Sequence, residues 1–336
     1  MTDHGINLIS KSLKRFSSLK ELSLDFADCH EISQKGLASL TQTLRNFLFL
    51  ESIRLGFPSG YEVSDKEIED LIDYLKRLVR LKSLDLNLKS FQITDVGLMS
   101  FGACLNNLRS LQKLALEFED CSEITDVGLD RIWESLNKLT DLESFSLKFL
   151  SIHQITDQGL SSLSGALKNL CKLQKLDVEF VSSSKISDEG LFSISKGLET
   201  LVMLREIDLW FDDCPKITSQ GLRDLGKGLK GLAQLQNVGV YLCGCSGMTD
   251  EGALSFCRDL ESLPCLEGLD FLADFCEGLT EEGLCMVCEI LSDLPCLQQV
   301  WLFWDPDYNI LLYGQNKVRG GLKNFVSPFK KKNQEV

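Results

Sequence analysis

Few residues in the chain have types and spacings that could do chemistry. Cys285-x-x-Cys288 has the spacing of two zinc ligands, because paired thiolates can bind one tetrahedral metal ion. No second such pair follows at a suitable distance, and the chain has only three histidines. Many cysteines instead recur at intervals of 31 residues: Cys214, Cys245 and Cys276; Cys257 and Cys288; Cys265 and Cys296. This regular recurrence favours a ladder of small buried side chains, so we expect no metal and no cofactor.

A second candidate is the stretch Gly221-x-x-x-x-Gly226-Lys227, which nearly matches a phosphate-binding loop. Gly228 follows where a Ser or Thr should coordinate magnesium, and the stretch has helical spacing instead of following a strand. The histidines also form no metal-binding or nucleophile pattern: His4, His30 and His153. We find no catalytic constellation, and the sequence predicts a protein that is not an enzyme and has no small-molecule substrate.

Composition narrows the function further. The 336 residues include 35 Lys and Arg against 49 Asp and Glu, a net charge of −14. Such acidity argues against nucleic-acid binding, because affinity for a polyanion comes largely from Lys and Arg at its phosphates. No apolar run approaches the ~18 residues of a membrane span. Thirteen cysteines, an odd number, without a signal peptide or any Asn-x-Ser/Thr site indicate free thiols in the cytoplasm, with the nucleus as a second compartment.

Internal repeats dominate the chain. The motif Leu-x-x-Leu-x-Leu recurs every 31 residues, with one interval of 30, starting at Leu19, Leu50, Leu81, Leu111, Leu142, Leu173, Leu204, Leu235, Leu266 and Leu297. A second motif, Ile-Thr-Asp-x-Gly-Leu or a close variant, follows the copies, as in residues 124–129 and 155–160. We therefore expect about ten structural repeats of 31 residues.

Each repeat changes its hydrophobic period internally. Leu114-x-Leu116-x-Phe118 alternates with period two, as in a strand, whereas Leu129-x-x-Ile132-x-x-x-Leu136 has helical spacing. The Thr and Asp before that helix supply side-chain oxygens for its first amides. One strand and one helix cannot bury both apolar faces, so the copies must stack. Parallel strands lie about 4.8 Å apart and helices 8–10 Å apart, which predicts a curved stack with strands on its concave face.

These motifs resemble the leucine-rich repeat superfamily. Leu111-x-x-Leu114-x-Leu116 with Cys121 and the following Ile-Thr-Asp-x-Gly-Leu is similar to the cysteine-containing class, known from F-box substrate receptors and related to ribonuclease-inhibitor-like arrays. The resemblance implies an α/β solenoid, a horseshoe with a parallel sheet on the concave face and helices on the convex face. It covers residues 1–305, and we expect residues 306–336 to form a C-terminal cap and a basic tail.

The chain departs from the family pattern in two ways. Its strands read Leu-x-Leu-x-Phe-x-x-Cys, which adds a buried aromatic column: Phe26, Phe57, Phe118, Phe149, Phe180 and Phe211. Residues 1–6 themselves fit the Ile-Thr-Asp-x-Gly-Leu motif, so the sequence opens within a repeat, with no F-box before it and without a polar cap. A truncation or an end covered by a partner would explain that opening.

The candidate binding site comes from the residues that point away from the core. If each repeat is numbered from its first Leu, positions 5, 7 and 9 face outward. Position 7 is polar or Gly in six repeats and then apolar in four: Trp210, Tyr241, Leu272 and Phe303. Carboxylates flank this row: Asp177, Asp208 and Asp270 at position 5, and Asp212 and Asp274 at position 9. Contiguous exposed aromatic residues are typical of protein interfaces.

We therefore predict a protein-binding site anchored by Trp210, Tyr241 and Leu272, whose carboxylates select a basic partner. Phe303, Trp301 and Trp304 are expected to cap the last repeat. An alternative is that Asn309–Tyr313 folds back and covers the aromatic row.

Residues 317–336 differ from the rest, with six Lys and Arg and one Glu. They can remain a solvated tail, touch an anionic membrane, or fold onto the acidic body.

The sequence thus predicts a non-catalytic protein-interaction scaffold. One alternative, from the family resemblance, is the substrate-recognition component of an SCF-type ubiquitin ligase, with the F-box upstream of Met1 or supplied by another chain. A second alternative is a regulator of a GTPase or another enzyme, of the ribonuclease-inhibitor-like type. Family members of that kind often have acidic tails, whereas this tail is basic.

Overall fold

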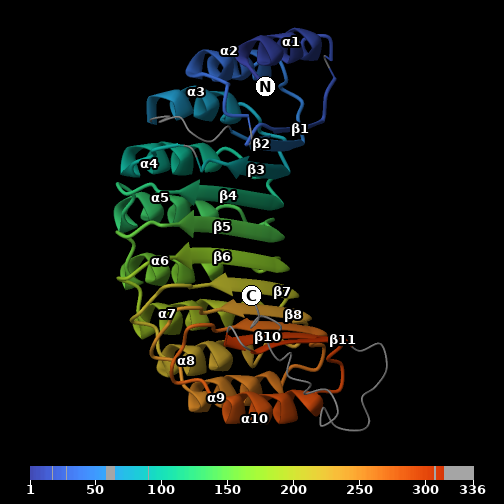
Figure 1. Ribbon diagram of the computed structural model, residues 1–336. Coiled ribbons are helices and arrows are strands. Elements are labelled where there is room, and N and C mark those ends of the chain that lie inside the picture. The colour runs from blue at the N-terminus through green and yellow to red at the C-terminus, as the bar shows by residue number, and fades with distance from the viewer. Residues whose placement is uncertain (17, 28, 58–64, 90, 306–307, 314–336) are drawn as a thin grey trace, which may run out of the picture. The chain divides into compact units, whose positions relative to one another are not determined.

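The computed structural model describes residues 1–16, 18–27, 29–57, 65–89, 91–305 and 308–313; for Glu67 and from residue 304 onward it describes the backbone alone. Contacts along the chain form two compact units, Met1–Ile155 and Thr156–Val336. In the described part of each unit, helices alternate with strands along the sequence, and the helices stack on one side of the strands (Figure 1). Each unit is a leucine-rich repeat solenoid.

The first unit contains these elements: α1 (Asp3–Leu13), β1 (Glu21–Asp25), α2 (Gln34–Leu44), β2 (Ser52–Gly56), α3 (Asp65–Leu75), β3 (Ser83–Asn87), α4 (Asp95–Leu105), β4 (Lys113–Glu119), α5 (Asp126–Leu136) and β5 (Ser144–Leu150). Its strands pair in parallel and in sequence order, without a shift of register. Residues at the same position of neighbouring repeats therefore lie side by side and form a row across the strands.

The second unit contains α6 (Asp157–Leu167), β6 (Lys175–Val181), α7 (Asp188–Leu198), β7 (Glu206–Trp210), α8 (Ser219–Leu229), β8 (Asn237–Tyr241), α9 (Asp250–Leu260), β9 (Gly268–Leu272), α10 (Glu281–Ser292), β10 (Gln299–Asp305) and β11 (Tyr308–Tyr313). Strands β6 to β10 are parallel neighbours in sequence order, whereas β11 turns back and pairs antiparallel with β10. The backbone of Asn309–Tyr313 thus extends the sheet beside β10, and does not fold back over Trp210 and Tyr241.

The core confirms the predicted periodicity. Leucines at positions 4 and 6 of the repeats are buried, except for the half-buried Leu24, and the extra aromatic column at position 8 is buried from Phe26 to Phe211. Phe118 and Phe149 stack at 5.2 Å between ring centroids, and Phe180 and Phe211 stack at 6.1 Å. Stacked rings at one position explain why the repeat keeps Phe there, since each copy buries the ring of the next.

The Ile-Thr-Asp-x-Gly-Leu motif links one repeat to the next through hydrogen bonds. Thr125 is the N-cap of α5, and its hydroxyl accepts a hydrogen bond from the Val127 amide at 3.2 Å, as predicted. The Asp has a different role, because Asp95 of the previous repeat accepts from the amide and the hydroxyl of Thr125 at 2.8 and 2.7 Å. The same carboxylate accepts from the amide of Gly128 at 3.1 Å.

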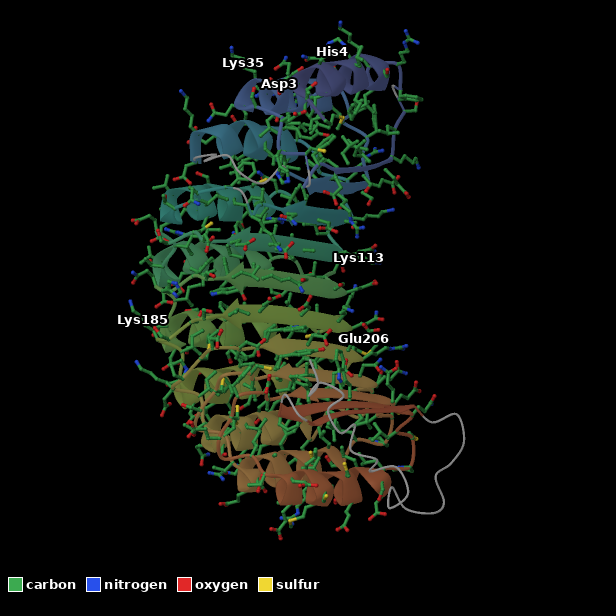
Figure 2. All side chains as sticks on the ribbon, in the orientation of Figure 1. Asp3, His4, Lys35, Lys113, Lys185 and Glu206 are labelled. Carbon is green, nitrogen blue, oxygen red and sulfur yellow. The ribbon has the colours of Figure 1, made fainter. Side chains whose placement is uncertain are left out.

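This Asp–Thr link recurs, with Ser in place of Thr at some repeats: Asp3 to Ser33, Asp65 to Thr94, Asp157 to Ser187, Asp188 to Thr218 and Asp250 to Thr280. It explains the motif glycine, since a Cβ at Gly221 would lie 2.5 Å from Oδ1 of Asp188. The two hydrogen bonds from Ser33 lower the pKa of Asp3, which Figure 2 labels on α1.

The cysteine ladder is confirmed in part. Cys214, Cys245 and Cys276 are buried, and each thiol donates to a carbonyl oxygen one repeat earlier, as Cys245 does to Phe211 O at 3.1 Å. The prediction that Cys265 and Cys296 are buried as well is wrong, because both precede their strands in the exposed turn after the helix. Within the chain that the structure describes, no group of three or more His, Cys, Asp or Glu side chains is arranged to hold a metal.

Candidate protein-binding face

Two aromatic rings form the centre of the candidate site. Trp210 ends β7 and Tyr241 ends β8, and the register pairs these two residues. Their rings lie flat against each other, with 3.4 Å between centroids and 5° between planes. The register places Leu272, at the end of β9, beside Tyr241. The row predicted from position 7 is therefore continuous, because the strands that carry it are adjacent and in phase.

Tyr241 is more buried than the sequence predicts. Strand alternation implies an exposed ring, but the side chain is only 6% exposed. Trp210 covers one face of the ring, and the ring bends down over Gly239, where a Cβ would lie 2.9 Å from Cε2 of Tyr241. Trp210 and Leu272 stay half-buried and present the accessible apolar surface. The expectation that Tyr241 is an exposed anchor is thus wrong. Its ring packs instead against one face of Trp210.

Carboxylates surround the Tyr241 hydroxyl. The hydroxyl donates to Asp270 Oδ2 at 3.4 Å, and the register places Asp208 beside Gly239, on the side opposite Asp270. Burial, followed by the charges of Asp270 and Asp208, raises the pKa of Tyr241. The phenol thus stays protonated and can only donate to these carboxylates.

Position 5 concentrates negative charge. Asp177 and Asp208 are register partners on β6 and β7, and Asp270 follows on β9. Burial, and next the neighbouring charge of Asp177, raises the pKa of Asp208 to about 6. Burial likewise raises the pKa of Asp270. Lys175 on β6 lowers the pKa of Asp208 only partly, since its ammonium group forms an ion pair with Glu206 at 2.7 Å.

Position 9 differs from the prediction at one residue. Asp212 is half-buried and accepts a hydrogen bond from the Cys243 amide at 2.7 Å, while burial raises its pKa. Asp274 is only 5% exposed, and its Oδ1 accepts from the amide of Phe275 at 2.8 Å. The expectation that Asp274 is an outward rim carboxylate is wrong, because the turn after β9 draws it into the structure.

Phe275 lies at position 10, in the turn after β9, and so was not among the outward positions 5, 7 and 9 considered in the sequence. Its side chain is 71% exposed and its φ is +57°, in the left-handed region that disfavours bulky residues. The equivalent turn residues in five other repeats are small or polar: Asp120, Ser151, Ser182, Asp213 and Gly244. The signal was available in the sequence, since position 10 holds a large apolar residue only in this repeat among those six.

At the same positions of the first unit, acidic side chains form ion pairs with basic side chains. Arg54 and Asp85, both at position 5, form an ion pair at 2.6 Å. Lys89 at position 9 binds Glu117 at position 7, with 3.0 Å between the charged atoms. In the second unit, positions 5, 7 and 9 of the repeats that carry β6 to β9 contain six Asp and Glu and neither Lys nor Arg. Figure 2 labels Glu206 at the start of β7 and Lys185 beyond the end of β6, both outside those positions.

We call the following residues the acidic strand face: Asp177, Glu179, Asp208, Trp210, Asp212, Tyr241, Asp270, Leu272 and Asp274. Its chemistry suits recognition of cations and flat apolar groups, because half-buried carboxylates border an aromatic surface.

The phosphate-loop candidate lies inside α8, where the Gly221 amide donates to Asp188 at 3.0 Å. In the described part of the chain, no helix is long and apolar enough to cross a membrane.

No protein-family model matches the sequence, and no curated protein is similar to it at a significant level. Among solved structures, the chain is similar to one titled as a complex of Rad7 and Elc1 in yeast, with 17% identity, a TM-score of 0.39 and coverage of 96% of this chain and 87% of that chain. A second is titled as a TLR13–ssRNA13 complex, with 16% identity, a TM-score of 0.42 and coverage of 87% of this chain. The chain spans 40% of that second protein.

Proposed function

We propose that this chain is a non-catalytic protein-interaction scaffold that binds a basic segment of a partner protein on its acidic strand face. The observation that carries the proposal is the difference between the two units at equivalent positions. Positions 5, 7 and 9 of the first unit include Arg54 and Lys89 beside their carboxylates, whereas the same positions of the repeats that carry β6 to β9 contain six Asp and Glu and neither Lys nor Arg.

The carboxylates of the second unit are arranged at a cost to the free protein. Asp177 and Asp208 face each other across neighbouring strands, and burial together with this repulsion raises the pKa of Asp208. A guanidinium or ammonium group from a partner would relieve the repulsion and form charge-assisted hydrogen bonds. Trp210 offers a flat surface for the apolar part of an arginine or lysine side chain.

Phe275 supplies a second contact on the same unit. A bulky residue with a left-handed backbone costs about 1–2 kcal/mol, and a ring that is 71% exposed buries little apolar surface in the free protein. Insertion into an apolar pocket of the partner would offset this cost. The proposed interface thus has an acidic, aromatic centre and an apolar contact at the ends of the strands.

Two finer assignments belong to the same proposal. The buried thiols of Cys214, Cys245 and Cys276 support a place in the cysteine-containing, ribonuclease-inhibitor-like class. The thirteen free cysteines support a reducing compartment, the cytoplasm or the nucleus. A role as an SCF-type substrate receptor or as an enzyme regulator would use the same face, and it is the identity of the partner that distinguishes these roles.

The test is affinity capture from native extract, with the full chain as bait and mass spectrometry as the readout. Trp210→Ala removes the accessible ring and leaves the buried side chain of Tyr241 in the protein. A triple variant, Asp177→Asn, Asp208→Asn and Asp270→Asn, removes charge without removing volume. Glu117→Gln in the first unit is the matched control, since it alters a carboxylate that is already paired.

We expect one or more basic proteins to be captured by the wild type and the control, and to be lost with both face variants. Recovery of ubiquitin-ligase subunits in that set would favour the substrate-receptor role. A captured partner that both face variants retain would refute the proposed site. Circular dichroism spectra of all variants establish that a loss of binding does not come from unfolding.

A further inference from the structure

Two exposed thiols lie at the same position of neighbouring repeats in the second unit. Cys265 and Cys296 each stand directly before the first Leu of a repeat, in the exposed turn between a helix and the next strand. The two turns have the same four residues, Leu-Pro-Cys-Leu, at 263–266 and at 294–297. Because Pro restricts φ, we expect both turns to share one backbone conformation and to present their thiols side by side.

The register of the sheet brings these two turns close together. Strands β9 and β10 pair in parallel from Gly268 and Gln299 onward, three residues after each cysteine. The carbonyl oxygen of Glu267 also accepts from the amides of Gln298 and Gln299, at 2.8 and 3.0 Å. Paired parallel strands lie about 4.8 Å apart, and a disulfide joins Cα atoms that are about 4.4–6.8 Å apart. The spacing of the strands therefore falls within the range of one disulfide bond.

Contacts in other repeats show that the turns stay as close as the strands that follow them. Met203 and Gln234 occupy the position of the two cysteines in the two preceding repeats, and their Sδ and Nε2 atoms lie 3.8 Å apart. In the first unit, the hydroxyl of Ser110 at this position donates to the carbonyl oxygen of Val79 in the neighbouring turn, at 3.2 Å. Side chains at this position thus reach from one turn to the next.

The geometry favours a reversible bond over a permanent one. A disulfide needs Cβ atoms about 3.5–4.5 Å apart, which is slightly closer than paired strands, so the two turns must approach each other to form it. A bond that is strained and exposed in this way is easily reduced, as regulatory disulfides are. In a reducing compartment the pair rests as two free thiols, the state in which the structure shows them.

We propose that Cys265 and Cys296 form a dithiol site that low-molecular-weight disulfides of the glutathione type oxidise to an intrachain disulfide. In the first step, the thiolate of one cysteine attacks the small disulfide, releases one reduced thiol and leaves a mixed disulfide on the protein. In the second step, the neighbouring thiolate attacks the protein sulfur of this mixed disulfide and releases a second reduced thiol. The two cysteines lose two protons and two electrons, and the small disulfide gains both.

The bond joins the repeat that carries β9 to the repeat that carries β10. The loop that it closes contains β9 and α10, the last helix in the described part of the chain. A cross-link limits the conformations open to such a loop. Oxidation therefore restrains α10, and this restraint can be measured separately from the bond itself.

The first experiment oxidises the reduced full chain, at low concentration, in buffers with a series of ratios of oxidised to reduced glutathione. The reaction is quenched with acid, the remaining thiols are alkylated, and a glutamate-specific protease cuts the protein for mass spectrometry. Trypsin is unsuitable, because no Lys or Arg lies between Arg258 and Lys317 and the resulting peptide would hold five cysteines. Cuts after Glu261, Glu267 and Glu289 separate the two cysteines of the site from the other three.

We expect a pair of linked peptides that joins Cys265 to Cys296. Cys171 is the internal control, since it is an exposed thiol of the same unit whose position holds Thr140 and Val202 in the neighbouring repeats. It should stop at the mixed disulfide with glutathione. We expect half of the site to be linked at a glutathione ratio about 10-fold less oxidising than the ratio that modifies half of Cys171, because the second thiol is held nearby.

The variants Cys265→Ser and Cys296→Ser each remove one thiol from an exposed turn. In either variant we expect the link to disappear and the remaining cysteine to carry glutathione at the ratio that modifies Cys171. Wild-type protein in which both cysteines carry glutathione and no link forms would overturn the proposal. A link that joins either cysteine to a different cysteine, or to a second chain, would overturn it as well.

The second experiment follows hydrogen exchange of the α10 amides in the oxidised and the reduced protein. We expect exchange about 10-fold slower in the oxidised wild type than in the reduced wild type, because the closed loop opens less often. The same two conditions should give equal rates for Cys265→Ser. Equal rates in both forms of the wild type would refute the restraint of the last repeat.

Discussion

Substitution of Asp208 by Asn should stabilise the free protein at neutral pH. The carboxylate of Asp208 is half-buried, is the register partner of Asp177 on the neighbouring strand, and contributes to the raised pKa of Tyr241. Burial and the charge of Asp177 raise its pKa to about 6, and Lys175 offsets this effect only partly. Asparagine has nearly the same shape and no charge, so Asp208→Asn removes the repulsion and leaves the packing in place.

The magnitude follows from the pKa. A rise from the ordinary 3.8 to about 6 corresponds to about 3 kcal/mol at ~1.4 kcal/mol per unit. Because the group is half-buried and solvent still reaches it, screening reduces this to about 1.5 kcal/mol. For an acid whose folded-state pKa is raised, the folded state binds the proton more tightly, so its stability is full below about pH 4 and falls as the pH rises through 6. Asp208→Asn has no carboxyl group to ionise at this position, so the stability of the variant does not fall in this way.

The assay is thermal unfolding followed by circular dichroism at about pH 4 and about pH 7. We expect the variant to melt about 3–6 °C above the wild type at neutral pH, and we expect the difference to shrink at acidic pH. Asp85→Asn is the matched control at position 5 of the first unit, where loss of the carboxylate leaves Arg54 without its ion pair and should not stabilise. A lower melting temperature for Asp208→Asn at neutral pH, or the same gain at both pH values, would refute the reasoning.

Three further predictions concern the links between repeats and the turn after β9. Gly221→Ala places a Cβ 2.5 Å from Oδ1 of Asp188, and we expect urea unfolding to show a loss of about 1–3 kcal/mol; unchanged stability would mean that the carboxylate moves freely. Ser219→Asp restores the usual Asp at a repeat where Ser219 Oγ accepts from the Thr249 amide at 2.9 Å, and we expect a gain of about 1 kcal/mol in the same measurement, with destabilisation as the contradicting result. Phe275→Asn suits the left-handed turn, so we expect a melting temperature at or above that of the wild type together with weaker partner binding in calorimetry; a variant that melts lower would show that the ring supports the fold.

The fold was predictable from the sequence because its signal is repeated. A single Leu-x-x-Leu-x-Leu motif is weak evidence, but ten copies in register leave little freedom, since each strand must place equivalent side chains beside those of its neighbours. The burial of Phe180 and Phe211 at position 8 follows from the same alternation. The Asp–Thr links were not predicted, because the Asp was assigned to its own helix. Only the stacked backbone shows that Asp95 reaches Thr125 of the next repeat.

The candidate site was less predictable, because alternation gives the side of the sheet toward which a residue points but not the path of its side chain. Tyr241 points outward and is nevertheless buried, since Gly239 two residues earlier leaves room for the ring to bend down and Trp210 then covers it. A glycine at position 5 beside an aromatic residue at position 7 is a local sequence signal for this geometry. For the proposed interface, this means that Tyr241, packed flat against Trp210, would orient that ring before a partner binds. Preorganisation of this kind lowers the entropic cost of binding, and it explains how a face with one half-exposed ring and three crowded carboxylates could serve as an anchor.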